Sequence, residues 1–368
     1  MIDVKEFYEI LKSNSINCFL GVPDSLLKSF CAYITDSASS NSLICANEGA
    51  AIAQAAGHYL STKNPALVYM QNSGLGNCVN PILSLMDEEV YKIPCLMLVG
   101  WRGEPDTKDE AQHIKQGKLT LKLLETLGIE YYVLDENWKK QLQKAIDYCK
   151  NEEKPFCLVA KKGIFDKYEL KNKTKTTFTL TREEAIETIL NKIPKNSFVV
   201  STTGFASREL YELREKRNES HDRDFLTVGS MGHSSAIALG IALEKKDKEI
   251  YCFDGDGAAL MHLGTYALIK SKSNEIKNFK HIVFNNYAHD SVGSQPTVSR
   301  FVDFKGFSDN YFCACDAKTL NEVLEKFVNL KASALLEIKI KCGARKNLSR
   351  PKESPKQTKE LFMEALNK

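Results

Sequence analysis

The chain has 368 residues, with 43% hydrophobic and 26% charged residues, which are ordinary values for a globular protein of about two domains. Its formal charge of +3 is too small to indicate a nucleic-acid partner. No apolar run approaches the roughly 20 residues of a membrane span, so we expect neither nucleic acid nor membrane as a partner.

The first half alternates short apolar runs with helix-period segments, such as Gly49–Leu60 and Trp138–Cys149. This alternation predicts a parallel sheet flanked by helices. The strand runs are Cys18–Leu20, Leu43–Cys45, Ala66–Met70, Cys95–Val99, Tyr131–Leu134 and Phe156–Ala160. We predict a first domain of residues 1–165, followed by a polar, lysine-rich linker at 166–180.

A second series of the same kind follows at 181–368. Thr181 to Glu184 reads as a capping box that opens a helix, and helical patterns recur at 236–243, 258–270 and 357–366. The strand runs are Phe198–Ser201, Phe225–Val228, Ile250–Phe253, His281–Phe284 and Ala334–Ile340. The predicted fold class is therefore α/β, with two domains that are each a parallel sheet flanked by helices.

The eleven cysteines are scattered over apparent strands and helices. Only Cys313 and Cys315 form a close pair, and their spacing does not suit a zinc knuckle. We expect reduced thiols in a cytoplasmic protein.

The strongest chemical signal is Gly255-Asp256-Gly257, which is separated by 27 residues from Asn285-Asn286. Both motifs follow predicted strands, so both lie where the carboxyl ends of parallel strands bind ligands. Mg²⁺ prefers oxygen ligands and usually shares them with phosphate and water. A carboxylate, an amide oxygen and a backbone carbonyl would suit a Mg²⁺–diphosphate, and the flanking glycines would allow a close approach of the chain.

The segment from Gly229 to Ser235 precedes an alanine-rich helical run. A loop of small residues that leads into a helix N-terminus favours an anion, because backbone N–H groups and the helix dipole point at it.

These motifs resemble those of the thiamine-diphosphate (ThDP) dependent enzymes. The resemblance implies Mg²⁺ held by Asp256, Asn286 and the carbonyl of Ala288. It also implies a bulky apolar residue that bends the cofactor, and Met231 stands at the matching place, 25 residues before Asp256. The cofactor-binding residues that it implies are Glu48, Gly74, Gly229, Met231, Gly255, Asp256, Gly257 and Asn286.

The family also requires a glutamate on its first domain. Glu48, in the run Asn47-Glu48-Gly49-Ala50-Ala51, matches that position. The resemblance implies that its carboxylate bonds to the aminopyrimidine ring of ThDP and promotes the proton transfer that activates the cofactor.

The chain is similar to the short ThDP-dependent 2-oxo acid decarboxylases, which lack a middle domain. Within them it resembles decarboxylases that act on 3-phosphonopyruvate in phosphonate biosynthesis. The residues that carry this likeness are Gly21–Leu27, Gly103–Pro105, Gln112–Gly117 and Ala288–Thr297. One departure is Tyr287, where the pattern has glycine.

The resemblance and the loop chemistry together suggest residues for the substrate. We expect Asp24, Ser25, His113 and Lys115 to bind it, since a phosphonate needs cationic or N–H partners. His113 and His289 join Glu48 as catalytic candidates. By the same resemblance each site lies between subunits, which implies a homodimer or a larger homo-oligomer.

Several alternatives stay open at this point. A decarboxylase of sulfopyruvate would share the mechanism, and carboligation is a further possibility. A non-catalytic ThDP-binding protein would not need Glu48. A nicotinamide oxidoreductase is disfavoured, because no G-x-G-x-x-G follows the first strand.

Overall fold

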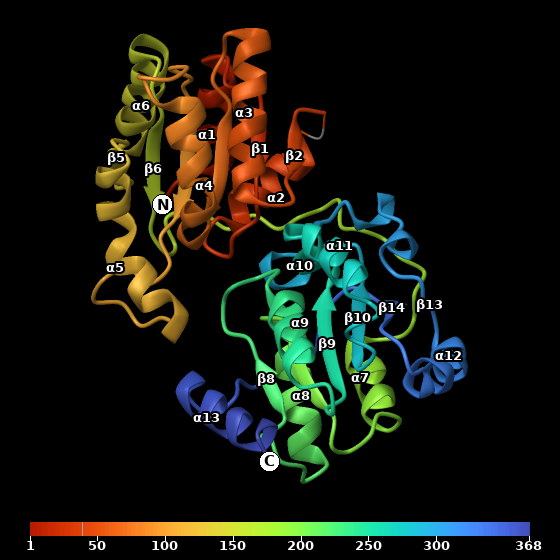
Figure 1. Ribbon diagram of the computed structural model, residues 1–368. Helices are drawn as coiled ribbons and strands as arrows, with labels where there is room; N and C mark the ends of the chain where they lie inside the picture. Colours follow the sequence, from red (N-terminus) through yellow and green to blue (C-terminus); the bar gives the residue numbers. More distant parts are fainter. Residues whose placement is uncertain (39) are drawn as a thin grey trace. The chain divides into compact units, whose positions relative to one another are not determined.

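The computed structural model describes residues 1–38 and 40–368, which form two compact units (Figure 1). Unit 1 comprises Met1–Lys173 and Val292–Gln295, and unit 2 comprises Thr174–Ser291 and Pro296–Lys368. Residues 166–181, around the predicted linker, contain neither helix nor strand. Within the described residues, no helix has both the length and the apolar character that crossing a membrane requires.

Unit 1 contains a parallel six-stranded sheet with the order β2-β1-β3-β4-β6-β5. Its strands are β1 (Phe19–Gly21), β2 (Ser42–Ile44), β3 (Leu67–Gln71), β4 (Leu96–Gly100), β5 (Glu130–Val133) and β6 (Phe156–Ala160). Its helices are α1 (Val4–Ser13), α2 (Lys28–Ser37), α3 (Glu48–Thr62), α4 (Leu75–Pro81), α5 (Ala111–Thr126) and α6 (Trp138–Glu152). The strand predictions for this half are confirmed, with ends shifted by at most one residue.

The central strands of this sheet are buried on both faces. In β3, Leu67 and Tyr69 pack into one apolar cluster, while Val68 and Met70 pack into another. Neighbouring residues of a strand point to opposite faces, so helices must cover both faces of the sheet. This explains why β3 reads as a continuous apolar run rather than as an alternating one.

Unit 2 contains a second parallel six-stranded sheet, with the order β13-β14-β10-β9-β7-β8. Its strands are β7 (Phe198–Ser201), β8 (Asp224–Leu226), β9 (Ile250–Gly255), β10 (Phe279–Asn285), β13 (Tyr311–Ala314) and β14 (Ala334–Lys339). Its helices are α7 (Arg182–Leu190), α8 (Phe205–Lys216), α9 (Ser234–Glu244), α10 (Asp256–Met261), α11 (Gly264–Ser271), α12 (Ala317–Asn329) and α13 (Pro355–Leu366). The short strands β11 (Ala288–His289) and β12 (Gln295–Pro296) lie between β10 and β13.

Apart from strand ends that shift by up to two residues, two features of this half differ from the predictions. The helix predicted at 258–270 is broken into α10 and α11 at His262, whose φ of −132° and ψ of 50° are not helical. Strand β13 was not predicted, although Tyr311–Ala314 is an apolar run; it is a short strand at the edge of the sheet, and most of its residues are partly exposed. The capping box at Thr181 and Glu184 is confirmed.

The parallel arrangement brings the carboxyl ends of the strands in each sheet to one edge. In unit 2, β7, β9 and β10 are neighbours, and their carboxyl ends lead into Thr202, Asp256 and Asn286. This edge therefore carries both halves of the predicted metal motif.

Candidate functional site

The first half of the motif, Asp256, begins α10 directly after β9, and its side chain is buried. The hydroxyls of Thr297 and Ser299 both donate to its Oδ2, at 2.5 and 2.7 Å. Burial raises the pKa of this carboxyl to about 6, although both hydroxyl bonds act in the opposite direction. A carboxylate oriented in this way offers its other oxygen, Oδ1, to a cation.

The second half of the motif, Asn286, follows β10 and is also buried. Its Nδ2 donates to Asp290 Oδ2 at 2.6 Å, and its Oδ1 accepts the backbone N–H of Ala288 at 3.0 Å. Asp290 therefore sets which way the amide of Asn286 faces. Its neighbour Asn285 points elsewhere, toward Glu337 and Ser299, and acts as a support for the loop.

The two glycines beside Asp256 have different surroundings. A side chain at Gly257 would lie 2.4 Å from the ring of His289, so the histidine packs directly on the Gly-Asp-Gly turn. A side chain at Gly255 would meet open space. Burial lowers the pKa of His289 to about 4, which leaves a neutral imidazole beside the predicted metal site at neutral pH.

Tyr287 stands where glycine was expected, and its backbone explains that expectation. Its φ is 62°, in the left-handed region that glycine adopts without strain. The tyrosine ring lies 5.4 Å from the guanidinium of Arg300 and 5.0 Å from the ammonium of Lys339. These two cation–π contacts offset part of the backbone strain.

The loop before α9 has a constrained backbone. Gly229, Ser230 and Gly232 all have positive φ, at 71°, 45° and 84°. A side chain at Gly232 would approach the backbone oxygen of Ala258 at 3.0 Å, so this loop lies against α10. Met231, the predicted wedge, is half-buried in this loop.

Two hydroxyls near this loop and the end of β7, those of Thr202 and Ser235, are buried and have no partner among the described residues. Buried polar groups are nearly always paired in native proteins. These hydroxyls therefore indicate where the polar atoms of a ligand would fit.

The predicted glutamate of unit 1, Glu48, is buried in the first turn of α3. Its Oε2 accepts a hydrogen bond from Asn77 Nδ2 at 2.7 Å. A side chain at Gly74 would lie 2.5 Å from Glu48 Oε1, so Gly74 provides the space that this carboxylate occupies. Gly74 thus supports Glu48, a role that its place in the sequence does not reveal.

The predicted substrate residues of unit 1 gather around Arg102, except for Lys115. Arg102 donates to Ser25 Oγ at 2.9 Å and forms two bonds to Asp109, at 2.8 and 2.5 Å. Asp24 is buried, and its pKa is raised by burial, an effect that Arg102 opposes. The charge of Arg102 is therefore already balanced by neighbouring acids.

His113 and Lys115 differ in their surroundings, although both lie on α5. His113 is buried, its Nδ1 has no partner among residues 1–38 and 40–368, and burial lowers its pKa. Its backbone oxygen lies where a side chain on Gly103 would project, so α5 packs tightly on the turn after β4. Lys115 is exposed. The roles of both residues stay predictions.

Sequence reasoning missed the residues that orient the site. Asp290 and Thr297 belong to the segment Ala288–Thr297, and Ser299 follows it. None of the three was expected to hold Asp256 or Asn286. The hydroxyl pattern Thr-x-Ser, on a loop after a predicted metal motif, was the available signal. Such a signal is weak, because Ser and Thr in loops usually bond to nearby backbone.

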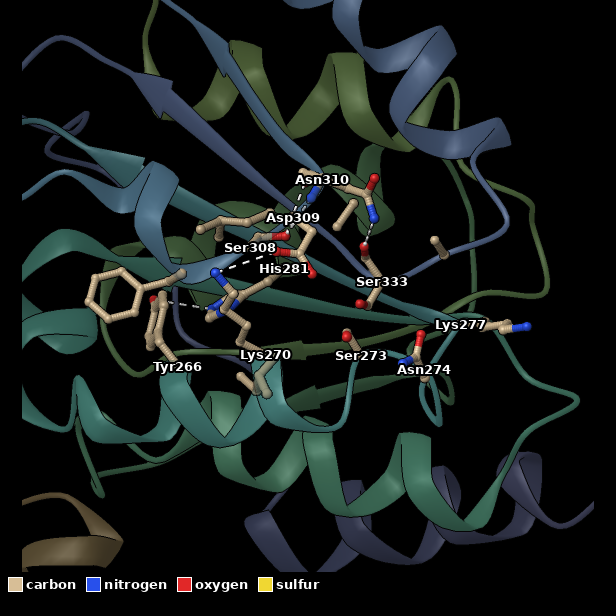
Figure 2. Close-up of a pocket in the computed structure, with 15 residues that line it drawn as sticks. Tyr266, Lys270, Ser273, Asn274, Lys277, His281, Ser308, Asp309, Asn310 and Ser333 are labelled. Atoms are coloured by element: carbon tan, nitrogen blue, oxygen red, sulfur yellow. Dashed lines mark hydrogen bonds and ion pairs between the residues drawn. The ribbon is translucent and has the colours of Figure 1, made fainter.

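A pocket of about 110 Å³ lies in unit 2 away from these residues, lined in part by Tyr266, Lys270, Lys277 and His281 (Figure 2). Several lining residues come directly before β10, β13 and β14, so the pocket lies at the amino ends of these strands. Asp256 lies at the carboxyl ends. Its volume is far below the roughly 300–1,000 Å³ of typical cofactor pockets. This pocket is therefore not the candidate cofactor site.

A buried group of possible metal ligands lies near that pocket. Side-chain ligand atoms of Cys252, Asp254 and His281 lie within 4.8 Å of one another. His281 Nε2 lies 3.4 Å from Asp254 Oδ2 and 3.3 Å from the Tyr266 hydroxyl, a contact that Figure 2 also shows. These groups interact with one another inside the sheet, and they include neither Asp256 nor Asn286.

The buried charge of Asp256 predicts a pH-dependent stability. The pKa of Asp256 is about 6 in the folded protein and 3.8 ordinarily. The protonated carboxyl therefore favours the folded state most below pH 4, and this contribution to the free energy of unfolding is lost as the pH rises through 6. We therefore expect Asp256→Asn to raise the thermal midpoint of the ligand-free protein by a few degrees at pH 7.5. The difference should vanish near pH 4. Differential scanning calorimetry across this range would check it, and a difference independent of pH would contradict it.

Comparisons with known proteins match both units. Residues 4–124 match the N-terminal TPP binding domain of the thiamine pyrophosphate enzymes, and residues 202–367 match the C-terminal TPP binding domain. The chain is 30% identical to phosphonopyruvate decarboxylase of Streptomyces viridochromogenes, over 98% of this chain and 94% of that protein. It is 32% identical to the sulfopyruvate decarboxylase subunit beta of Methanocaldococcus jannaschii, over 51% of this chain and 97% of that protein. Benzoylformate decarboxylase of Polynucleobacter necessarius aligns with a TM-score of 0.39 at 11% identity, covering 94% of this chain and 100% of that one.

Proposed function

We propose that this chain, which belongs to the thiamine pyrophosphate enzymes, decarboxylates 3-phosphonopyruvate to phosphonoacetaldehyde and CO₂. The choice of substrate is supported by the near full-length similarity to the Streptomyces phosphonopyruvate decarboxylase. We further propose that the reaction belongs to phosphonate biosynthesis and that it requires Mg²⁺.

The residues of unit 2 fit a magnesium diphosphate. Asp256 and Asn286 offer a carboxylate and an amide oxygen, and the backbone carbonyl of Ala288 would complete the protein's share of an octahedral site. The buried hydroxyls of Thr202 and Ser235 lack partners among the described residues, and ligand oxygens would satisfy them. Thr297 and Ser299 would hold Asp256 in place without ligating the metal.

The residues of unit 1 fit the other end of the cofactor. Glu48 is buried, its Oε2 is held by Asn77, and Gly74 leaves space beside Oε1. A carboxylate held in this way would take and return a proton at Oε1. When bound, ThDP supplies a nucleophilic carbon and an electron sink, which let the bond between C1 and C2 of the 2-oxo acid break.

The proton balance of the reaction requires a donor at C2. The carboxylate leaves as CO₂, its bonding electrons remain at C2, and one proton must arrive there before phosphonoacetaldehyde leaves. His289 is neutral at pH 7 and lies on the Gly257 turn, so one ring nitrogen can donate while the other accepts. We assign it this proton transfer, and we keep His113 as the second candidate.

Three further properties belong to the same proposal. We propose a homodimer or a larger homo-oligomer with its active sites at the subunit interface. We place the enzyme in the cytoplasm, supported by eleven cysteines that the structure leaves as free thiols. We propose Asp24, Ser25, His113 and Lys115 as the residues of unit 1 that bind the substrate.

Sulfopyruvate is the second candidate substrate, because subunits of sulfopyruvate decarboxylases are also related to this chain. A sulfonate carries one negative charge where a phosphonate carries up to two, so the two acids differ in the cationic contacts that they need. A non-catalytic ThDP-binding protein would leave the buried, oriented carboxylate of Glu48 without a purpose.

A direct comparison of turnover tests this proposal. The purified chain, loaded with ThDP and Mg²⁺, would be assayed for CO₂ release from phosphonopyruvate, sulfopyruvate and pyruvate. We expect kcat/KM to be highest for phosphonopyruvate, by about tenfold or more, since one charge-assisted contact is worth that much. A higher value for sulfopyruvate would favour the alternative, and no CO₂ from any of the three acids would reject the decarboxylase.

A further inference from the structure

Arg208 differs from the other arginines near the candidate site, because no acidic partner for it lies in residues 1–38 or 40–368. It lies in the first turn of α8, directly after the carboxyl end of β7, and it is half-buried. Among the described residues no carboxylate pairs with its guanidinium, and its recorded contact is the ring of Phe205, 5.9 Å away. Burial lowers the pKa of its guanidinium.

The other buried or half-buried arginines of the candidate site are neutralised. Arg102 pairs with Asp109, and Arg182 pairs with Glu209 at 2.7 Å and with Asp290 at 3.7 Å. A half-buried cation without a counter-ion keeps its N–H donors available for an anionic ligand. Arg300 also lies in unit 2, but it is exposed, so water solvates it.

Arg208 is connected to the metal loop through one aromatic ring. The guanidinium of Arg182 lies 5.6 Å from the ring of Phe205, which Arg208 also contacts. Arg182 pairs with Asp290, and Asp290 accepts the hydrogen bond that orients Asn286. The unpaired cation therefore belongs to the same edge of unit 2 as the predicted Mg²⁺ ligands.

We propose that Arg208 binds the phosphonate of the substrate and thereby selects 2-oxo acids that carry a second anionic group. This inference rests on the proposed function and deepens it. A guanidinium can form two parallel bonds to a phosphonate, a geometry that a lysine cannot reproduce. Phe205 would keep the guanidinium plane in place through the cation–π contact.

The test compares Arg208→Gln with Arg208→Lys and with a matched control, Arg223→Gln. Arg223 is also half-buried, and its guanidinium also lies over a phenylalanine ring, that of Phe198 at 5.5 Å. Phe198 begins β7, so this second pair lies at the amino end of the strand, whereas Arg208 follows its carboxyl end. The control therefore removes the same charge and the same kind of contact away from the site.

In the holoenzyme we expect Arg208→Gln to lower kcat/KM for phosphonopyruvate by about 10- to 150-fold, the scale of one lost charge-assisted contact. Residual turnover of pyruvate and the affinity for ThDP with Mg²⁺ should change less than about twofold. A change of that size is smaller than the loss of one contact to pyruvate or to the cofactor would cause. Arg208→Lys should lie between the wild type and the glutamine variant. Arg223→Gln should match the wild type on every measurement.

Binding of 3-phosphonopropanoate, which lacks the reactive keto group, separates this inference from the proposed function. Calorimetric titration of the holoenzyme should detect binding by the wild type and a loss of about tenfold or more in Arg208→Gln. If the wild type binds 3-phosphonopropanoate but does not decarboxylate phosphonopyruvate, and Arg208→Gln loses this binding, the proposed function is rejected and the inference is kept. Equal losses on pyruvate and phosphonopyruvate, a parallel loss of ThDP affinity, an unchanged variant, or no binding by the wild type would each overturn it.

Discussion

Glu48→Gln is expected to lower kcat by at least about 100-fold while ThDP and Mg²⁺ still bind, which is the usual scale of acid–base assistance. Glutamine fills the same space beside Gly74, and its amide can still bond with Asn77. It cannot carry the negative charge that promotes the activating proton transfer. The change therefore removes chemistry and leaves the binding of the cofactor in place.

Two measurements separate that role from a structural one. Exchange of the C2 proton of bound ThDP for deuterium, followed by quenched NMR, should slow in parallel with kcat. Glu130→Gln, an exposed glutamate on β5 of the same sheet, serves as the control and should leave both rates unchanged. Exchange at the wild-type rate in Glu48→Gln would show that the carboxylate has another purpose.

Asp256→Ala should weaken the Mg²⁺-dependent binding of ThDP by at least about tenfold, the scale on which even supporting groups of a metal site matter. Asp256 supplies the one carboxylate of the predicted ligand set, and its loss also leaves the hydroxyls of Thr297 and Ser299 without their acceptor. The fold should survive, because the buried charge itself is destabilising at neutral pH.

Calorimetric titration with ThDP, at fixed Mg²⁺ concentrations, would measure this loss. Circular dichroism and the melting temperature of the ligand-free variant would show that the fold is intact. Asp247→Ala, a change at an exposed aspartate of unit 2, is the matched control and should bind like the wild type. An unchanged affinity in Asp256→Ala would remove this residue from the metal site.

The predicted strands follow from local sequence, because they depend on short-range periodicity, and the Gly-Asp-Gly and Asn-Asn motifs lie at the ends of two of these strands. An apolar run such as 156–160 becomes a buried strand, and the structure has it at the same residues. Parallel strands then bring Asp256 and Asn286 to one edge without further information. The thiamine pyrophosphate family is confirmed by the matches of residues 4–124 and 202–367 to its two TPP binding domains.

The difference at Tyr287 shows how a local expectation gains its physical reason only from the structure. A glycine was expected there, and the backbone does adopt a left-handed conformation, with φ at 62°. The tyrosine that stands there has two cations, Arg300 and Lys339, near its ring, and these contacts offset part of the strain. These residues lie 13 and 52 positions along the chain, beyond the reach of any local pattern.

By itself the sequence determined the two α/β units, since strand periodicity acts over a few residues, and its resemblance to the ThDP-dependent enzymes predicted the metal motif and the role of Glu48. The tertiary structure alone decided which groups complete the site. Thr297 and Ser299 reach Asp256 from 41 and 43 residues away, and Asn77 reaches Glu48 from 29. It also decided that Arg102 is paired and that Arg208 has no acidic partner among the described residues, because the pairing and burial of a charge depend on residues that only folding brings together.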